Sequence, residues 1–369
     1  MLNLLIKPAS GACNMCCKYC FYHDEIARRN VPYRGIMQKK TADALIEKVF
    51  EQEKQAVLFA FQGGEPMIAG LDFFKSFVKK VRESNKNKIK VGYTIQTNGL
   101  LLNAQWAKFL RENKFLVGLS YDSLIHDRFR LDTFGRGTHT EVVRAAKIME
   151  KHGVEFNILT VVTADIAKNI EKIYEDMKRR RFRYLQFIPC LNPLDNDKNF
   201  EYTLGNDDYL YFLRTLFSLW YEDFMSGNYV SIRYFDNLYS LFIGEMAEQC
   251  GMSGQCCIQY VVEGNGDVYP CDFYCLDEYC LGNICEKSFT ELCSGMSAKR
   301  FIQESTGFSS RCKTCKCFAL CRSGCRRYQR DGEYIYCNAF LEFYNDLQEK
   351  LPKIRERLKS YMNTQSKIK

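Results

Sequence analysis

Histidine, tryptophan and proline are scarce in this chain: its 369 residues contain four histidines, two tryptophans and seven prolines. None of the histidines is spaced with the grouped cysteines as a zinc ligand would be, which weakens any zinc site that needs imidazole. The scarcity of proline leaves room for long regular elements, because proline interrupts both helices and central strands.

Long apolar runs and strong charge clusters are also missing. The start, Met1–Pro8, has too short an apolar core for a signal peptide, no cleavage signature follows, and no run reaches a membrane-spanning length. The net charge is +8, and the densest basic run, Lys178–Arg183, is short. We interpret that run as a solvated helix face. We therefore expect a cytoplasmic protein with no membrane and no nucleic-acid partner.

Cysteine, by contrast, is abundant, with 19 in the chain. Four lie within eight residues near the N-terminus, and thirteen lie from Cys250 to Cys325. A cytosolic chain of this size does not need disulfides, and its thiols stay reduced. The cysteines are therefore interpreted as metal ligands.

Up to about residue 190, short apolar runs alternate with amphipathic stretches. The predicted strands are Leu2–Lys7, Val57–Phe61, Val91–Gln96, Phe115–Ser120, Glu155–Val162 and Tyr184–Ile188. The predicted helices are Thr41–Lys54, Leu71–Arg82, Ala104–Glu112 (capped by Asn103), Glu141–His152 and Ile166–Lys178. This order predicts an α/β fold, an open partial (β/α)6 barrel with its working face at the strand C-termini.

Beyond the barrel pattern the composition changes. A polar linker, Asn192–Asn206, precedes an aromatic helix, Tyr209–Phe224, and a predicted strand, Val230–Tyr234. From Cys250 onward cysteine, glycine and aromatics dominate. We expect a barrel domain over residues 1–240, a cysteine-rich domain over 241–349, and a basic C-terminal helix and tail over 350–369.

A Cys-x3-Cys-x2-Cys spacing, formed by Cys13, Cys17 and Cys20, follows the first strand. Three thiolates from one loop can hold three irons of a [4Fe–4S] cluster and leave the fourth iron open. A zinc knuckle that uses Cys16 as a fourth ligand is the local alternative. The position at the mouth of a β/α barrel, followed by Gly63-Gly64-Glu65-Pro66 after the second strand, favours the cluster.

This combination resembles the radical S-adenosylmethionine (SAM) superfamily. The resemblance implies that Cys13, Cys17 and Cys20 are cluster ligands, that SAM binds the open iron, and that its cleavage yields a 5′-deoxyadenosyl radical. The glycines would let the backbone approach the SAM ammonium, and Glu65 would add a compensating charge. Further SAM contacts implied by the family pattern are Tyr19, Gly64, Ser120, Arg130 and Leu191. Ser120-Tyr-Asp-Ser-Leu124 departs from the usual Ser-x-Asp-Gly-Pro and looks shortened.

The C-terminal cysteines resemble the SPASM extension of peptide-modifying radical SAM enzymes. Two auxiliary [4Fe–4S] clusters are implied, which gives three clusters in all. The family pattern assigns Cys250, Cys256, Cys271 and Cys325 to the first and Cys312, Cys315, Cys321 and Cys337 to the second. Two zinc ribbons are the structural alternative, because Cys-x2-Cys pairs commonly bind zinc.

Within that group the chain resembles anaerobic sulfatase-maturating enzymes. The residues that carry this resemblance are Leu5–Ala9, Cys20–His23, Phe59–Pro66, Ile95–Gly99, Ser231–Asp236 and Tyr269–Tyr274. The resemblance implies oxidation of a cysteine or serine in a sulfatase Cys/Ser-x-Pro-x-Arg segment to Cα-formylglycine. Asp272, next to Cys271, would be the base that takes the thiol or hydroxyl proton, and Gln62 and Tyr22 would line the substrate cavity.

The partners implied are an unfolded or nascent sulfatase polypeptide and an electron donor such as flavodoxin or ferredoxin. One rival is a radical SAM enzyme that forms thioether or carbon–carbon crosslinks; such enzymes usually begin with a precursor-recognition domain, for which we expect no room ahead of the first strand. Another rival is a zinc-stapled binding protein. The sequence leaves open whether the target is cysteine, serine or both.

Overall fold

The computed structural model describes residues 1–194 and 200–366, with side chains described as far as residue 360. The chain forms two compact units. The first comprises Met1–Leu159, Asn192–Asp197 and Cys257–Glu304; the second comprises Thr160–Leu191, Lys198–Cys256 and Ser305–Lys369. Part of the predicted linker, residues 195–199, lies outside the described residues.

The first unit contains the β/α repeat and part of the cysteine-rich region. Its main elements are β1 (Leu2–Ile6), α1 (Phe21–Ile26), α2 (Lys39–Gln52), β2 (Ala56–Phe61), α3 (Leu71–Ser84), β3 (Lys90–Thr97), α4 (Ala104–Glu112), β4 (Phe115–Ser120), α5 (His126–Phe129), α6 (His139–His152), β5 (Glu155–Val162, which continues into the second unit), β8 (Val261–Val262), β9 (Asp267–Tyr269), β10 (Gly282–Asn283), α11 (Phe289–Ser294) and α12 (Met296–Glu304).

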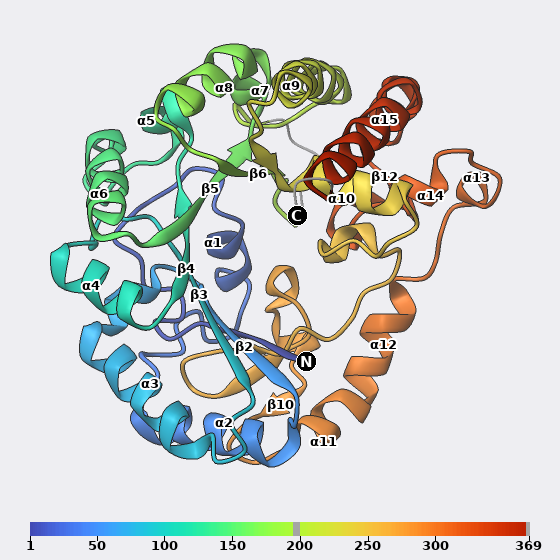
Figure 1. Cartoon of the computed structure of the whole chain (residues 1–369). Helices are drawn as coiled ribbons and strands as arrows, with labels where there is room; N and C mark the ends of the chain where they lie inside the picture. The colour runs from blue at the N-terminus through green and yellow to red at the C-terminus, as the bar shows by residue number, and fades with distance from the viewer. Residues whose placement is uncertain (195–199, 367–369) are drawn as a thin grey trace. The chain divides into compact units, whose positions relative to one another are not determined.

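A curved sheet organises this unit, with strand order β10-β9-β8-β1-β2-β3-β4-β5. Strands β1 to β5 pair in parallel, β8 joins parallel to β1, and β9 and β10 complete an antiparallel edge. Helices α2, α3, α4 and α6 cover its outer side, whereas α1 lies on the inner side (Figure 1). The C-terminal ends of β1, β2, β3 and β4 therefore lie at one edge of the sheet. The polar residues that follow these strands lie at that edge too.

The side chains of β2 alternate between buried and partly exposed positions, which shows why the outer helices pack against this sheet. Phe59 and Phe61 are buried, and their rings lie 5.2 and 5.1 Å from the ring of Phe77 on α3. Because successive side chains of a strand face opposite sides, these two share the face that α3 covers. The opposite face is left for the loops that follow the strands.

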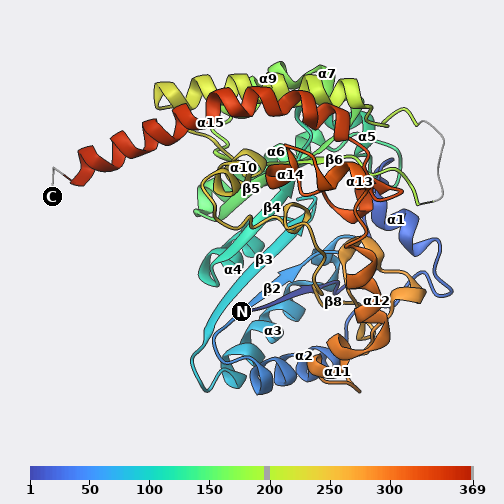
Figure 2. The same cartoon turned by 90° about the vertical axis from the view of Figure 1, so that its right-hand side faces the viewer.

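The second unit is mostly helical. Its main elements are α7 (Ala164–Lys168), α8 (Ile170–Arg179), β6 (Tyr184–Pro189), α9 (Asn206–Ser226), β7 (Ser231–Ile232), α10 (Arg233–Phe242), α13 (Ser310–Lys313), α14 (Phe318–Cys321), β11 (Gln329–Arg330), β12 (Glu333–Tyr334) and α15 (Cys337–Ser366). Strands β6 and β7 pair in parallel, and α9 and α15 lie side by side (Figure 2).

The six predicted barrel strands are confirmed to within one residue at each end. Two other predictions need correction. The helix predicted over Ile166–Lys178 is two helices, because Asn169 ends α7 and begins α8, and its side chain donates to Asp165 O at 2.9 Å. The strand predicted over Val230–Tyr234 is reduced to Ser231–Ile232, since α10 begins at Arg233.

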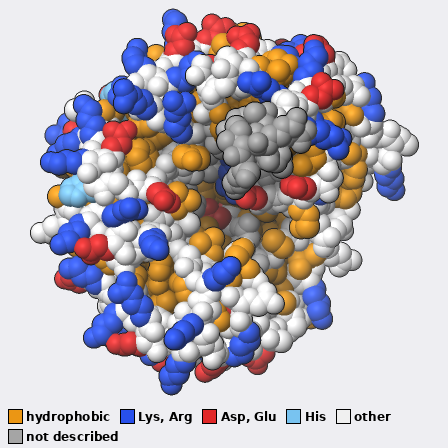
Figure 3. Space-filling model, viewed as in Figure 1, with side chains coloured by type: hydrophobic (Ala, Val, Ile, Leu, Met, Phe, Trp, Pro, Cys, Tyr) orange, Lys and Arg blue, Asp and Glu red, His pale blue; other side chains and the backbone are white. Residues whose placement is uncertain are grey.

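Charge is dispersed on the face shown in Figure 3, where Lys and Arg side chains lie among acidic and apolar ones. In the basic run that ends α8, Arg179 and Arg180 both pair with Asp176, at 2.5 and 2.9 Å. The run thus belongs to a helix end, as predicted, and its arginines pair with a buried carboxylate. No helix among the described residues has an apolar stretch long enough to cross a membrane.

Candidate active site

The loop between β1 and α1 carries Cys13, Cys17 and Cys20, all half-buried, whereas Cys16 is exposed. Backbone hydrogen bonds fix its shape: Cys16 N donates to Leu131 O at 2.8 Å, and Lys18 N donates to Phe129 O at 3.0 Å. Cys16 is thus more exposed than the three cysteines of the Cys-x3-Cys-x2-Cys spacing.

The pKa values of these thiols bear on whether they suit an iron–sulfur cluster. Burial raises the pKa of Cys13 to about 12, and Glu65, Cys17 and Cys20 raise it further by their negative charge. Burial likewise raises the pKa of Cys17 to about 11, with Cys20 adding to the effect. With pKa values this high the thiols stay protonated at neutral pH unless a metal binds, and metal binding deprotonates such thiols. The donor set fits a [4Fe–4S] cluster with one open iron.

The Gly-Gly-Glu-Pro segment lies directly against this loop. Gly64 N donates to Ser10 O at 2.9 Å, and a Cβ on Gly64 would lie 2.2 Å from Ala12 O. Gly63 has φ +123°, a conformation that only glycine adopts readily. The glycines thus permit close packing against the cysteine loop, a reason that the sequence analysis did not include.

Glu65 is fully buried and joins two neighbouring strand ends. Its carboxylate accepts hydrogen bonds from Asn98 N at 2.8 Å, Met67 N at 3.0 Å and Thr97 Oγ1 at 2.9 Å. Burial raises the pKa of Glu65 to about 7, although these hydrogen bonds oppose the rise. A positively charged group brought next to Glu65 would relieve this cost.

A second polar group forms around Asp122, which sequence reasoning did not single out. Its carboxylate receives Arg130 Nε at 2.8 Å and Arg130 Nη2 at 3.3 Å, and the hydroxyl of Tyr19 donates to it. Ser120, at the end of β4, is buried nearby in sequence. The structure thus brings Tyr19 and Arg130 together through Asp122. Leu191 belongs to the second unit, so its place beside these residues stays a prediction.

Asp272 opens a short 3-10 turn (Asp272–Tyr274) directly after Cys271, and it is 8% exposed. Lys7 Nζ lies 2.8 Å from Asp272 Oδ1, and Gln62 Nε2 donates to Oδ2 at 2.5 Å. Lys7 is fully buried and its ammonium lies 3.4 Å from the ring centroid of Tyr22. Although burial opposes its charge, Asp272 and further neighbours raise the pKa of Lys7. The chain thus holds a fixed carboxylate beside a predicted cluster ligand.

Lys7 is the residue that sequence reasoning missed here. It stands in the Leu5–Ala9 segment, and a lone charge inside an otherwise apolar strand end was the available signal. Gln62 was predicted to line the substrate cavity, and the structure places its amide against Asp272.

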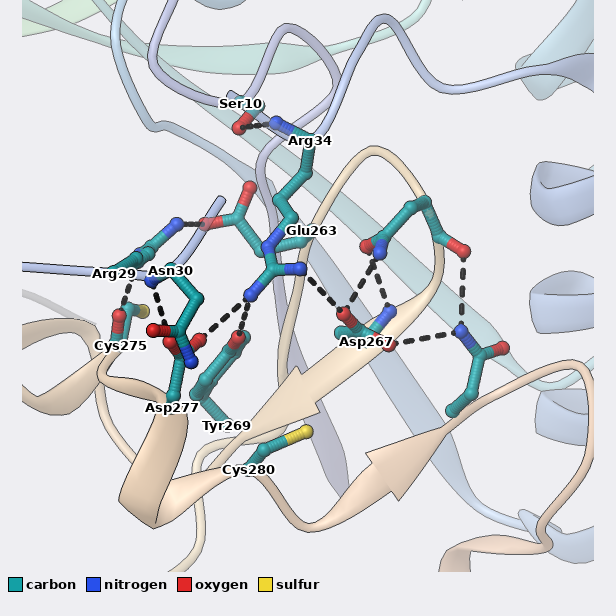
Figure 4. Close-up of polar contacts among 12 residues, drawn as sticks. Ser10, Arg29, Asn30, Arg34, Glu263, Asp267, Tyr269, Cys275, Asp277 and Cys280 are labelled. Carbon is teal, nitrogen blue, oxygen red and sulfur yellow. Dashed lines mark hydrogen bonds and ion pairs between the residues drawn. The ribbon is translucent and has the colours of Figure 1, made fainter. Parts of the chain in front are cut away.

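A network of ion pairs and hydrogen bonds joins the residues that follow the cysteine loop to the segment that contains Asp272 (Figure 4). Arg29 Nη1 lies 2.8 Å from Glu263, which also accepts from Tyr22, and Arg29 Nε donates to Cys275 O. Farther along, Arg34 Nη2 pairs with Asp277 at 2.7 Å, and Asn30 N donates to the same carboxylate at 2.7 Å. Arg29, Asn30 and Arg34 therefore hold the segment that directly follows the turn of Asp272, at Cys275 and Asp277.

The C-terminal cysteines fall into groups within the second unit. Burial raises the pKa of Cys321 to about 12, and the charges of Cys337, Cys312 and Cys315 add to the rise. Burial also raises the pKa of Cys325 to about 12, with contributions from Cys250 and Cys256. The division of these cysteines between two auxiliary clusters stays a prediction, and thiol-only sets of this kind suit iron–sulfur clusters.

Cys271 lies in the first unit, so its grouping with Cys250, Cys256 and Cys325 stays a prediction. Cys317, which was treated as an incidental thiol, is buried and interacts with Cys315.

Comparisons with known proteins agree with this site. The radical SAM superfamily matches residues 8–177, and the iron–sulfur cluster-binding SPASM domain matches residues 250–317. A cysteine-type anaerobic sulfatase-maturating enzyme of Clostridium novyi is 43% identical over 97% of this chain and 98% of that enzyme. Its Clostridium perfringens counterpart is 45% identical over 97% and 99%. A serine-type enzyme of Bacteroides thetaiotaomicron is 28% identical over 99% and 93%.

The solved structure described as native anSMEcpe with bound AdoMet has a TM-score of 0.92 and 44% identity, covering 96% of this chain and 99% of that one. The predicted α/β fold, a partial barrel with a SPASM domain, is confirmed, as are SAM, a [4Fe–4S] cluster and auxiliary clusters as cofactors. The chain belongs to the anaerobic sulfatase-maturating enzymes of the radical SAM superfamily.

Proposed function

We propose that this enzyme oxidises the cysteine of a sulfatase Cys-x-Pro-x-Arg segment to Cα-formylglycine. The observation that carries the proposal is the buried carboxylate of Asp272, held by Lys7 and Gln62 next in sequence to Cys271. Preference for cysteine over serine is supported by the relatives, since cysteine-type enzymes are 43–45% identical and serine-type ones 26–28%.

Three groups of residues would hold the cofactors. Cys13, Cys17 and Cys20 would bind the cluster with the open iron, and Glu65 and the backbone at Gly64 would receive the positively charged part of SAM. Tyr19, Ser120, Arg130 and Leu191 would complete that site. When bound, these cofactors supply a 5′-deoxyadenosyl radical that removes a hydrogen atom from the target Cβ, and an auxiliary cluster accepts the remaining electron.

The chain's own contribution to the oxidation is proton transfer and positioning. Asp272 would accept the proton from the target thiol, because a general base must lie within hydrogen-bond reach of the proton it takes. Lys7 and Gln62 each engage one oxygen of Asp272, which fixes the plane of the carboxylate. After the Cβ hydrogen atom has left, loss of the thiol proton and of one electron leaves a thioaldehyde, which water hydrolyses to the aldehyde with release of hydrogen sulfide.

The auxiliary ligands would be Cys250, Cys256, Cys271 and Cys325 for the first cluster. Cys312, Cys315, Cys321 and Cys337 would hold the second. Because Asp272 follows Cys271 directly, the base and the electron acceptor would be covalent neighbours. Proton and electron would then leave the substrate on the same side.

The enzyme acts on peptide substrates, as its relatives do: one neighbouring structure contains AdoMet together with a Cp18Cys peptide. We further propose that the physiological substrate is an unfolded or nascent sulfatase in the cytoplasm. A flavodoxin or ferredoxin would supply the electron that starts each turnover. The thiol-rich sites support this placement, because thiolate ligands need a reducing compartment.

A paired assay tests the cysteine preference. The anaerobically purified enzyme is incubated with SAM, a reductant and one of two peptides that differ only in cysteine or serine at the target position. We expect the aldehyde product by mass analysis from both, with a higher kcat/KM for the cysteine peptide. Equal or reversed kcat/KM values would contradict the cysteine assignment, and absence of aldehyde from both would contradict the proposed function.

A further inference from the structure

A chain of hydrogen bonds runs through His126, a buried histidine of the first unit that begins α5. Asp122 N donates to His126 Nδ1 at 3.2 Å. On the other side of the ring, His126 Nε2 lies 3.1 Å from Thr138 Oγ1. The hydroxyl of Thr138 in turn donates to Arg130 O at 3.0 Å. The imidazole therefore joins the main chain at Asp122 to the main chain at Arg130, the two residues whose side chains form the buried ion pair.

The protons of this chain can be placed one by one. The hydroxyl of Thr138 has a single proton, and Arg130 O can only accept, so that proton lies between them. Thr138 Oγ1 is then the acceptor for His126 Nε2–H, and His126 Nδ1 carries no proton because it accepts from Asp122 N. Burial lowers the pKa of His126 to about 4, and the guanidinium of Arg130 lowers it further. The ring is thus neutral at physiological pH and held in one tautomer.

Both ends of the chain are supported by their neighbours. Asp127, which follows His126 directly, accepts hydrogen bonds from Thr138 N and His139 N, both at 2.7 Å. The side chain of Thr138 is therefore presented from a fixed point before α6. At the other end, Ser123 follows the amide that donates to the ring and has φ +51°, a conformation that is uncommon for residues other than glycine. A hydrogen bond to the preceding amide helps to hold that turn.

The carbonyl of Arg130 lies between two carbonyls that accept from the cysteine loop, those of Phe129 and Leu131. Arg130 has φ −102° and ψ 88°, so the chain is nearly extended here. In an extended chain successive residues face opposite sides, which is why Arg130 O can meet Thr138 while its neighbours meet the cysteine loop. The contact from Thr138 thus fixes the point from which the Arg130 side chain leaves the main chain.

We propose that His126 and Thr138 are positioning residues for SAM: they hold the main chain at Arg130 so that its guanidinium stays in place for the cofactor. The proposal rests on the proposed function, which assigns Arg130 to the SAM site. Neither side chain needs to touch SAM, because both act through Arg130 O. Loss of the Thr138 hydroxyl would leave that buried carbonyl without this donor and let the segment move.

The test measures SAM binding without peptide or turnover. Thr138→Val replaces the hydroxyl by a methyl group, whereas Thr138→Ser keeps the hydroxyl. Equilibrium dialysis of the anaerobic, cluster-containing enzyme against SAM is expected to give a dissociation constant about tenfold higher for Thr138→Val, the scale of one buried hydrogen bond. Thr138→Ser should bind SAM as the parent does. Iron content should equal the parent's in both variants.

A second substitution probes the same chain from the ring. His126→Phe keeps an aromatic ring but removes both nitrogens, so SAM binding should weaken at least as much as in Thr138→Val. Combining the two substitutions should weaken binding little further, because both remove the same support at Arg130 O. Thr140→Val is the matched control, since Thr140 stands in the first turn of α6 and is exposed.

The inference is overturned if Thr138→Val binds SAM as the parent does at full iron content, or if Thr138→Ser binds as weakly as Thr138→Val. It is also overturned if the fold-changes of His126→Phe and Thr138→Val multiply in the double variant. Loss of iron in both single variants would likewise overturn it, because the two residues would then be structural. A parent enzyme that contains its clusters and binds no SAM would contradict the proposed function itself, so the two failures are distinguishable.

Discussion

At the scale of single residues, the site depends on how Asp272 is held. The carboxylate is almost completely buried, with a lysine ammonium on one oxygen and a glutamine amide on the other. Tyr22, beneath the ammonium of Lys7, donates to Glu263, which itself pairs with Arg29. A row of alternating charges therefore runs inward from the base, and each member would be costly to leave unpaired.

The first prediction concerns the base itself. Asp272→Asn keeps the shape of the side chain but cannot accept a proton at neutral pH. A general base contributes about 10²–10⁴-fold, so formylglycine formation should fall by that order. Deoxyadenosine should still form, now uncoupled from peptide oxidation, when both products are measured in one anaerobic assay. Near-normal peptide oxidation would move the base elsewhere, and loss of both products would give Asp272 a role in folding or SAM binding.

The second prediction concerns Lys7. Lys7→Met keeps most of the side-chain volume but leaves the Asp272 carboxylate without its buried cation. Removing one partner of a buried ion pair costs about 3–5 kcal/mol, so urea unfolding should report a loss of this size. Lys80→Met is the control, because Lys80 pairs with Glu47 at the surface, where solvent screens the pair and its loss should change stability little. Equal losses in both variants would refute the buried-pair account.

At the scale of elements, the cysteine loop and the Gly-Gly-Glu-Pro turn pack against each other at the C-terminal ends of β1 and β2. Gly64 approaches Ala12 too closely for any side chain, and Glu65 N donates to Ala12 O at 2.8 Å. The cluster loop therefore depends on a neighbouring strand for its shape as well as on its own sequence.

A third prediction follows from this packing. In Gly64→Ala the new methyl group would meet a backbone oxygen, which cannot rotate away as a side chain could. Overpacking of this kind costs about 1–3 kcal/mol, so thermal unfolding should occur at lower temperature and SAM binding should weaken. Gly307→Ala, where no atom lies within 4 Å of the new Cβ, should leave both unchanged. Wild-type stability and SAM binding in Gly64→Ala would show that the loop adapts.

The fourth prediction concerns the loop cysteines. Replacing Cys13, Cys17 and Cys20 together by Ala should remove about four irons per chain, the content of one [4Fe–4S] cluster, and abolish SAM cleavage. Cys16→Ala should keep both, because Cys16 faces solvent. Iron analysis and deoxyadenosine measurement check this, and persistent SAM cleavage in the triple variant would contradict the assignment.

Much of this arrangement could be predicted from sequence because it is local. The strands are short apolar runs, Asn103 caps α4 as expected, and the cysteine spacing is short. Lys7 could not be placed, since its partner Asp272 is 265 residues away (272 minus 7) and only folding joins them. Helix α6 begins at His139, earlier than the predicted Glu141, because a residue outside the helix supports its first turn. Asp127 accepts hydrogen bonds from Thr138 N and His139 N, both at 2.7 Å.

At the scale of the whole molecule, the chain combines a partial barrel with a cysteine-rich extension. The two compact units do not follow the predicted domains simply, because Cys257–Glu304 belongs with the barrel strands of the first unit through β8 and β1. The division at residue 240 stays a prediction. Asp272 thereby shares a unit with Cys13, Cys17 and Cys20, so the proposed base and the proposed cluster ligands belong to one scaffold.

The central claim is that a hydrogen atom leaves the target Cβ and that the same residue becomes an aldehyde. The most direct test uses a Cys-x-Pro-x-Arg peptide with deuterium at both Cβ positions of the cysteine. The enzyme with SAM and a reductant should yield 5′-deoxyadenosine that carries one deuterium, in step with peptide aldehyde that retains the other. Aldehyde formed alongside unlabelled deoxyadenosine, or labelled deoxyadenosine with a crosslinked peptide and no aldehyde, would contradict the account.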